Sequence, residues 1–186
     1  MTIDNTGGEH DGRIYVTWTD FDPQSIGERS GTRILFSYST DHGDNFTRPV
    51  FQVSTVTPNP GPGASMPPFF FEEYPQAPYV QASVPVVAPN GDLYVVWLNS
   101  FDEPGGPGYI KIRKNTSGGN PDYWGDILTA ANITVAWHNY IGKLHGSSFP
   151  TIAITPSGIL YIAYTQWIND DDLDIYYVLS TDGGET

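Results

Sequence analysis

The fold of this chain is decided by a phrase that occurs three times: GRIYVTW at residues 12–18, GDLYVVW at 91–97 and GILYIAY at 158–164. Each copy is a glycine followed by β-branched and aromatic residues and ends on a large aromatic, which is typical of a turn leading into a buried β-strand. Repetition of one phrase at such intervals indicates successive copies of one supersecondary unit.

A second signature follows the strand after each phrase. Strand 33–39 leads into STDHGDNF at 39–46, and strand 174–180 leads into STDGGET at 180–186. The middle copy has strand 109–114 followed by NTSGG at 115–119, with Ser117 in the place of the aspartate. Each unit is therefore predicted to be a meander of four antiparallel strands, with the phrase as its second strand and the signature in the turn between its third and fourth strands.

This signature resembles the Asp-box, Ser/Thr-x-Asp-x-Gly-x-x-aromatic, of sialidases and related propellers. The resemblance implies an all-β fold, a partial β-propeller of four-stranded antiparallel blades with about two and three-quarter blades present. It implies blade 1 over 1–53, an insertion at 54–83, blade 2 over 84–130, a connection at 131–148 and an incomplete blade 3 over 149–186. Its structural Asp-box residues are Ser39, Asp41, Gly43, Phe46, Ser180, Asp182 and Gly184.

The signature has a physical logic that concerns stability and not catalysis. The carboxylate of Asp41 can accept backbone N–H groups across the turn, as in Asx turns. Gly43 supplies a positive φ that a side chain would penalise. Phe46 is expected to pack back against its blade and anchor the hairpin.

The number of blades is too small for a closed ring, because propellers use about 4–8 blades. We therefore expect the chain to be a fragment, with Met1 an internal start and the remaining blades of the same polypeptide as its first partner. Closure by oligomerisation is the alternative.

The ligand face is predicted at the end of the blades opposite the signature turns. The turns between first and second strands are expected to be short and regular, whereas loops 19–32, 98–108 and 165–173 are variable, and ligand sites favour variable loops. Aromatic side chains together with carboxylates suit carbohydrate binding; alternatively, the aromatics fill gaps between loops and the acids are solvated. The candidate ligand-face residues are Asp20, Asp22, Asp102, Glu103, Trp167 and Asp170.

The composition excludes several partners. With 8 Lys+Arg against 21 Asp+Glu the net charge is −13, which disfavours nucleic acid. No apolar run is long enough to span a membrane, and the absence of cysteine excludes thiolate sites. No cofactor is expected apart from a weak calcium candidate at Asp170, Asp172 and Asp174. Residues 1–5 lack the features of a signal peptide, so an extracellular or cell-surface location is implied by the resemblance alone.

Two functions stay open at this stage. Sialidases hold the sugar carboxylate with three arginines, one of them in an Arg-Ile-Pro motif; the nearest approach here, Arg33-Ile34-Leu35, lacks the proline. No residue therefore inherits a catalytic role. The chain is either a fragment of an extracellular sialidase-like propeller that binds glycans or cell-surface proteins, or a fragment of an exo-glycosidase whose catalytic arginines and nucleophile lie in missing blades.

Overall fold

The computed structural model describes residues 1–21, 32–47, 50–54, 79–100, 106–135, 147–169 and 172–185. Within these ranges the regular elements are β-strands and one 3₁₀ turn, η1 (Pro121–Tyr123), with no α-helix. The strands are rich in β-branched and aromatic residues, which fit a pleated and partly buried surface. The prediction of an all-β chain is confirmed.

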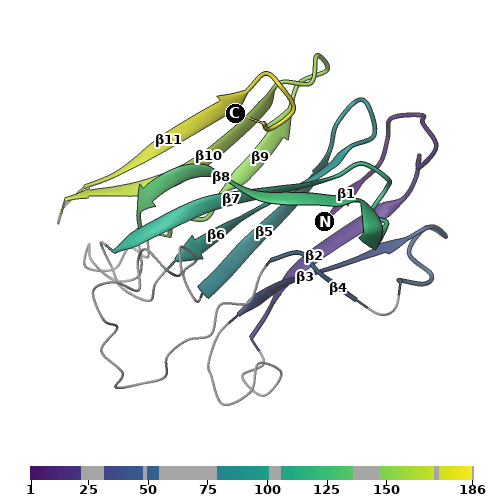
Figure 1. Ribbon diagram of the computed structural model, residues 1–186, viewed down its shortest axis with the longest axis horizontal. Helices are drawn as coiled ribbons and strands as arrows, with labels where there is room; N and C mark the ends of the chain where they lie inside the picture. Colours follow the sequence, from purple (N-terminus) through teal and green to yellow (C-terminus); the bar gives the residue numbers. More distant parts are fainter. Residues whose placement is uncertain are drawn as a thin grey trace.

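The strands form three antiparallel sheets that lie side by side, each with its strands in chain order (Figure 1). The first sheet contains β1 (Thr2–Ile3), β2 (Ile14–Asp20), β3 (Arg33–Ser39) and β4 (Phe51–Gln52). The second contains β5 (Tyr79–Val87), β6 (Leu93–Ser100), β7 (Pro107–Asn115) and β8 (Trp124–Thr134). The third contains β9 (Thr151–Ile154), β10 (Leu160–Asn169) and β11 (Asp172–Ser180).

The three repeated phrases are equivalent second strands of these sheets, namely β2, β6 and β10. Their pairing with the following strand has one register throughout, because the residue two positions after the glycine always faces the first residue of the signature turn. These pairs are Ile14 with Ser39, Leu93 with Asn115, and Leu160 with Ser180. The predicted four-stranded meander is therefore present in the first and second sheets, and its first three strands are present in the third.

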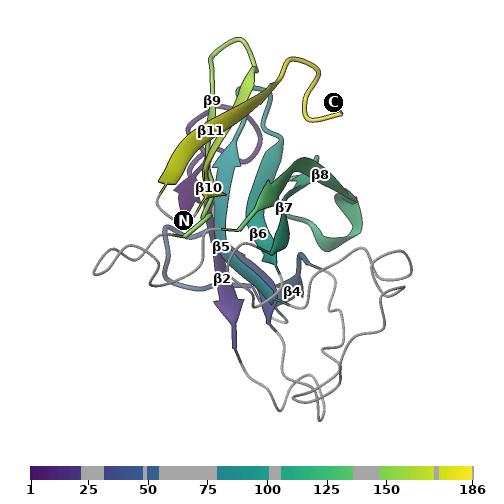
Figure 2. The ribbon, with the colours of Figure 1, turned by 90° about the vertical axis from the view of Figure 1, so that its left-hand side faces the viewer.

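Two hydrophobic cores lie between the sheets, one on each face of the second sheet, which is stacked between the other two (Figures 1 and 2). Because side chains alternate along a strand, Leu93, Val95 and Trp97 of β6 belong to the core shared with the first sheet. Tyr94 and Val96 belong to the core shared with the third sheet. Every residue of β6 is consequently buried.

β5 begins earlier than the sequence predicts. Its first residue, Tyr79, lies inside segment 54–83, which the sequence assigns to an insertion. A register shift between Gln81 and Val84 separates this extension from the predicted strand, and Ala82 within it has a φ of 56°. The extension is thus a bulged continuation of the strand.

The predicted loop 165–173 is also wrong, since β10 continues to Asn169 and β11 begins at Asp172. Trp167 pairs with Leu173 across this longer hairpin. The error has a simple cause: threonine, tryptophan and isoleucine at 165–168 are strand formers, so the hairpin continues through them.

Candidate functional site

The first signature turn is organised by the side chains of Ser39 and Asp41. Ser39 Oγ accepts hydrogen bonds from the backbone N–H groups of Asp41 at 3.3 Å and Gly43 at 2.9 Å. It donates its own proton to Asp41 Oδ1 at 2.7 Å. Asp41 in turn accepts from the backbone N–H of Asn45 at 2.9 Å and from its side-chain amide at 2.8 Å. The turn is therefore closed by one connected network.

The signature turn of the third sheet has the same serine contacts, and its aspartate again accepts a backbone N–H, here three residues further along the chain. Ser180 Oγ donates to Asp182 Oδ1 at 2.6 Å and accepts from the backbone N–H of Gly184 at 2.8 Å. Asp182 Oδ1 also accepts from the backbone N–H of Glu185 at 3.1 Å. The serine and the aspartate occupy matching roles in the two turns.

The middle turn reaches the same backbone conformation with a different side chain. Asn115, which is fully buried, replaces the serine, and its Oδ1 accepts from the backbone N–H groups of Ser117 at 3.0 Å and Gly119 at 2.8 Å. Its Nδ2 donates to the carbonyl of Asn120 at 2.7 Å. The loss of the aspartate at position 117 is thus offset by a residue two positions earlier.

All three turns place two consecutive residues in the left-handed region. The second of each pair, Gly43, Gly119 or Gly184, has a φ between 86° and 98°, where a side chain would be strained. Phe46 does not follow its prediction, because 41% of its side chain is exposed. The hairpin does not need Phe46 as an anchor, because residue 47 closes it. Thr47 donates its N–H to the Tyr38 carbonyl, and its Oγ1 forms a hydrogen bond with Ser37 Oγ.

These turns also contact the preceding sheet. Arg13 of the first sheet donates to the carbonyl of Gly118 and stacks over the Tyr38 ring at 4.8 Å. Tyr94 of the second sheet donates its hydroxyl to the carbonyl of Gly183 at 3.0 Å. A Cβ added at Gly119 would lie 2.7 Å from the Phe36 ring. The glycines therefore allow close packing between sheets as well as a tight turn.

The carboxyl of Asp41 has a lowered pKa, about 2 against an ordinary value of 3.8. The side-chain and backbone hydrogen bonds from Asn45 are the main cause, and the bond from Ser39 adds to them. Asp41 is therefore ionised over the whole physiological range, in keeping with a role as a fixed acceptor.

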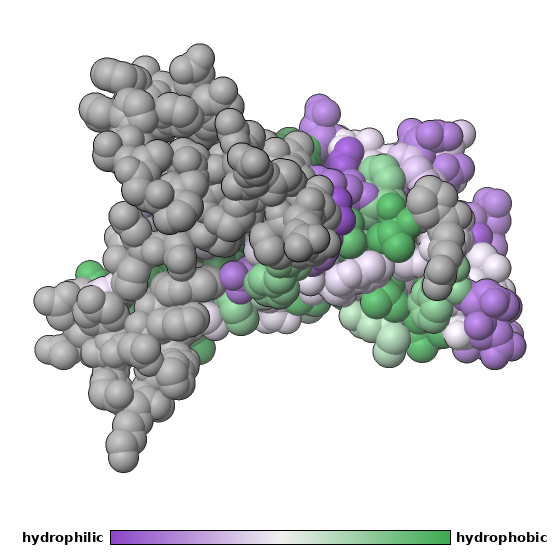
Figure 3. All heavy atoms as spheres, turned by 90° about the horizontal axis from the view of Figure 1, so that it is seen from below, coloured by the Kyte–Doolittle hydropathy of each residue, from purple (hydrophilic) through white to green (hydrophobic). Residues whose placement is uncertain are grey.

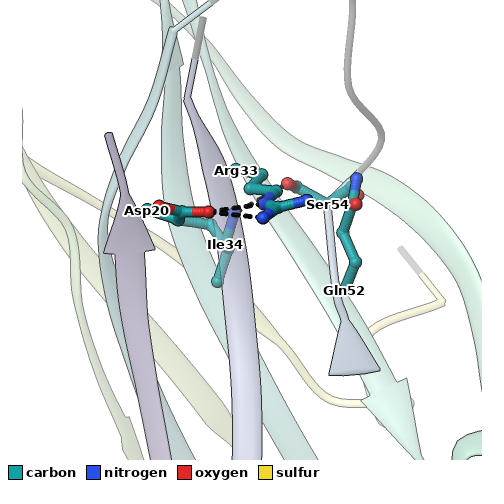
Figure 4. Close-up of polar contacts among 5 residues, drawn as sticks. All are labelled: Asp20, Arg33, Ile34, Gln52 and Ser54. Carbon is teal, nitrogen blue, oxygen red and sulfur yellow. Dashed lines mark hydrogen bonds and ion pairs between the residues drawn. The ribbon is translucent and has the colours of Figure 1, made fainter. Parts of the chain in front are cut away.

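At the opposite end of the sheets, Asp20 forms an ion pair with Arg33 (Figure 4). The two residues face each other across β2 and β3, and Asp20 Oδ2 accepts from both Nε and Nη2 of Arg33 at 2.6 Å. Ser54 Oγ beside them accepts the N–H of Ile34 at 2.9 Å. Asp20 thus partly neutralises the arginine that comes nearest to the Arg-Ile-Pro motif.

Of the other candidate ligand-face residues, Trp167 is half-buried on β10. Four lie outside the described residues: Asp22, Asp102, Glu103 and Asp170. Of the calcium candidates, Asp174 is exposed on β11 opposite Gln166, and Asp172 is the first residue of that strand. Among the described residues no three His, Cys, Asp or Glu side chains are grouped as metal ligands. The calcium site stays a prediction.

The arginines within the described ranges are all engaged by the protein itself. Arg13 and Arg33 are bonded as above, and Arg113 donates to the carbonyls of Gly125 at 2.8 Å and Val53 at 2.9 Å. Its guanidinium also lies over aromatic rings of the neighbouring strands. Each of the three guanidinium groups thus has at least one partner within the chain.

Sequence reasoning missed a buried lysine. Lys111 is 7% exposed, donates to Thr129 Oγ1 at 2.6 Å and lies 4.9 Å from the centre of the Tyr109 ring. Burial lowers the pKa of Lys111. The alternation Ile110-Lys111-Ile112 reads as a strand with one solvated face, whereas Lys111 is buried although it points away from the core that contains Ile110 and Ile112.

Sequence reasoning also missed a pocket of about 180 Å³ at the signature-turn end. The connection between β1 and β2 is longer than expected, and with the β5–β6 turn it lines this pocket. Asp4 at its wall is fully buried. Its Oδ1 accepts from the N–H and hydroxyl of Thr6, whereas its Oδ2 has no hydrogen-bond partner among the described residues. Asp4 Oδ2 is therefore a buried acceptor next to this pocket.

No helix within the described ranges is long and apolar enough to cross a membrane. The sequence matches no protein-family model, and no curated protein matches it.

The fold is similar to parts of solved structures. The Hadza microbial sialidase Hz136 matches with a TM-score of 0.59 and 16% identity, covering 99% of this chain and 35% of that chain. A protein of unknown function from Dyadobacter fermentans DSM 18053 matches with a TM-score of 0.53 and 15% identity, covering 93% and 49%. Zg3597, a family 117 glycoside hydrolase from Zobellia galactanivorans, has a TM-score of 0.46 and 12% identity, covering 92% and 49%.

At these identities the likeness concerns the fold alone. The chain spans 35% of the sialidase and 49% of the Dyadobacter protein. The chain is therefore all-β, and its fold is similar to that of a part of the sialidase.

Proposed function

We propose that this chain forms consecutive blades of an Asp-box β-propeller and binds glycans at the end of the sheets opposite the signature turns. The observation that carries the proposal is the repeated relation between neighbouring sheets. The glycine turn of one sheet accepts a hydrogen bond from the sheet before it, once from Arg13 and once from Tyr94. Repetition of one sheet-to-sheet relation is what builds a propeller.

The likeness to a sialidase supports glycan recognition, since this chain matches that fold along 99% of its own length. The aromatic and acidic candidates on the ligand end suit sugars, which stack on rings and donate hydroxyl protons. Trp167 is the described aromatic among them. An extracellular or cell-surface location is part of this proposal.

Binding without catalysis is favoured by the internal contacts of the arginines. The described arginines are held by internal contacts, and Asp20 offsets the charge of Arg33. The alternative function is a part of an exo-glycosidase, favoured by the fact that the chain corresponds to 35% of a sialidase. In that case the arginines and the nucleophile are supplied by the rest of the ring.

A glycan array and a fluorogenic sialoside separate the two functions. We expect the chain to bind glycans on the array without turning over the sialoside. W167A should weaken binding by at least about tenfold, as loss of a stacking platform does. Y123A is the matched control, because Tyr123 is a 54% exposed aromatic at the signature-turn end. Absence of glycan binding, or equal losses in the two variants, contradicts the proposed site; sialoside turnover contradicts the non-catalytic function.

A further inference from the structure

The pocket at the signature-turn end, which we call the turn-end pocket, lies between the first and second sheets. The connection between β1 and β2 forms one wall, which includes Asp4, Glu9 and His10. The β5–β6 turn with Asn90, and Thr116 of the middle signature turn, form the other. Figure 1 shows these connections at one end of the sheets, and Figure 3 shows hydrophilic residues at that end. The pocket is thus a polar feature of the end opposite the proposed glycan-binding end.

The wall formed by the first sheet is an addition to the repeated unit. In the second sheet the turn between the first and second strands spans residues 88–91, and in the third it spans 155–158. Each is closed by its glycine N–H, which donates to the carbonyl of the first residue at 2.9 Å. The first sheet makes the same closure at 2.8 Å from Gly12 to Asp4, over nine residues instead of four. A hairpin of this kind therefore does not need the extra residues.

Asp4 is equally unnecessary to the closure of the hairpin. By the hydrogen bonds of the turn its equivalents are Ala88 in the second sheet and Thr155 in the third. Asp4 is nonetheless fully buried, and a buried carboxylate needs a charge partner or hydrogen-bond donors. Thr6 supplies Oδ1 with its N–H at 2.9 Å and its hydroxyl at 2.6 Å, whereas no described residue donates to Oδ2. One oxygen of this carboxylate therefore lacks a donor.

His10 contributes a second buried atom without a partner. Its Nδ1 forms no hydrogen bond in the described part of the chain, and its ring packs against Gly118, where an added Cβ would overlap it. When the ring proton is on Nε2, Nδ1 is an acceptor. The neighbouring Arg13 donates to the Gly118 carbonyl and forms no ion pair with Asp4 in the described structure. Glu9 adds an exposed carboxylate, and the described lining residues include no lysine or arginine.

We propose that the turn-end pocket binds a small molecule through a primary ammonium group. Such a group carries the charge that the carboxylates of Asp4 and Glu9 attract, and its N–H donors suit Asp4 Oδ2 and His10 Nδ1. The pocket has a volume of about 180 Å³, and a cavity of about 150 Å³ holds benzene, so a short amino alcohol fits its size. A metal ion suits it less, because no three His, Cys, Asp or Glu side chains are grouped as ligands among the described residues.

Ethanolamine is the probe, with ethylene glycol as its uncharged counterpart of similar size and choline as a cation without N–H donors. NMR titration of the 186-residue chain, followed through the backbone amides, gives both the affinity and the place of binding. We expect ethanolamine to shift the amides of Glu9, His10 and Thr116 with a Kd in about the millimolar range, as for a ligand with so few atoms. Ethylene glycol and choline should leave these amides unchanged.

Three results of this titration would overturn the proposal. They are equal shifts with ethylene glycol or choline, no shift of these amides with ethanolamine, and a response to calcium chloride at lower concentrations than to ethanolamine. The last result would assign the pocket to a metal ion.

Two variants test the carboxylates. D4N keeps an oxygen for Thr6 but loses the charge, so ethanolamine binding should weaken by at least about tenfold. E9Q changes an exposed side chain and should weaken binding by about twofold with the fold intact. D174N is the matched control, because Asp174 is an exposed acid on the third sheet, and it should bind as the parent does.

Parent-like binding by folded D4N, or by E9Q where D4N does not fold, would contradict the site, as would an equal loss in D174N. W167A should bind ethanolamine as the parent does, since Trp167 is not among the lining residues. The ammonium site and the proposed glycan site can therefore fail separately.

Discussion

The middle signature turn offers the sharpest test of how these hairpins are stabilised. We expect Asn115→Ala to destabilise the chain strongly although it removes only one amide group. The side chain is fully buried and bonds two backbone N–H groups and one carbonyl, those of Ser117, Gly119 and Asn120. Alanine leaves all three backbone groups without this partner, and the turn would have to unfold locally for them to find another.

The magnitude follows from the three contacts. Each buried polar group left unpaired costs about 1–3 kcal/mol. The bond at Gly119 is buried, whereas the bonds at Ser117 and Asn120 are partly buried and water can replace part of them. We therefore expect a loss of about 3 kcal/mol, equivalent to a fall in Tm of about 6–12 °C for a domain of this size.

The assay is urea unfolding followed by tryptophan fluorescence, with thermal unfolding by circular dichroism beside it. All variants are compared at one protein concentration, because association would add to the apparent stability. Tryptophan reports the relevant region, since Trp124 lies directly after the turn.

A second pair of substitutions separates the loss of the hydrogen bonds from the loss of side-chain volume at position 115. Asn115→Ser keeps an acceptor for the two N–H groups but lacks the aspartate that orients the serine in the other turns. Adding Ser117→Asp completes the Ser-x-Asp pattern seen at Ser39 and Ser180. We expect the double variant to be more stable than the sum of its single changes predicts, by about 0.5–3 kcal/mol. An N115A variant as stable as the parent, or strict additivity in the cycle, would refute the reasoning.

Three further predictions concern the same contacts. Y94F should lower the free energy of unfolding by about 1 kcal/mol, since the Tyr94 hydroxyl bonds the Gly183 carbonyl. Y123F should change it much less, because 54% of the Tyr123 side chain is exposed to solvent; chemical unfolding compares the two variants. G119A should lower the free energy of unfolding by about 1–3 kcal/mol more than G91A does. Both glycines have a φ of 87°, but an added Cβ contacts an aromatic ring only at Gly119, so equal losses would contradict close packing there. The pKa of Asp41 is lower in the folded chain, so the stabilisation by its carboxylate is complete above pH 3.8 and is lost as the pH falls towards 2. The Tm difference between the parent and D41N should shrink over that pH range, and a constant difference would exclude this stabilisation.

The sequence was sufficient for the presence and order of the strands, because local chemistry specifies them, but it was not sufficient for the ends of β5, β10 and β11. The repeated Gly-to-aromatic phrase predicts a turn and a strand from adjacent residues, and the register at Ile14, Leu93 and Leu160 follows from it. The signature turns could also be predicted where serine and aspartate are both present. These features depend on neighbours in the chain, which a sequence displays directly.

What the sequence could not reveal depends on neighbours in space. Lys111 alternates with isoleucines and reads as solvated, yet it is buried and bonded to Thr129. Asn115 reads as a degraded motif, because its role requires knowing that an amide oxygen reaches the same two N–H groups as a serine hydroxyl. The ligand end was predicted from loop variability, and most of its candidates lie outside the described residues.

A comparison of the three turns separates what a hairpin needs from what a neighbouring sheet needs. The aspartate can be lost, since Asn115 replaces the serine and aspartate together. The donor from the preceding sheet can also change, from Arg13 in one interface to Tyr94 in the next. The second glycine is present in all three turns, and at Gly119 and Gly184 it contacts the preceding sheet. It follows that the glycine is the part of the signature on which sheet packing depends, whereas the aspartate serves the hairpin of its own sheet. G119A should therefore weaken contact between sheets, while D41N should affect its own turn alone.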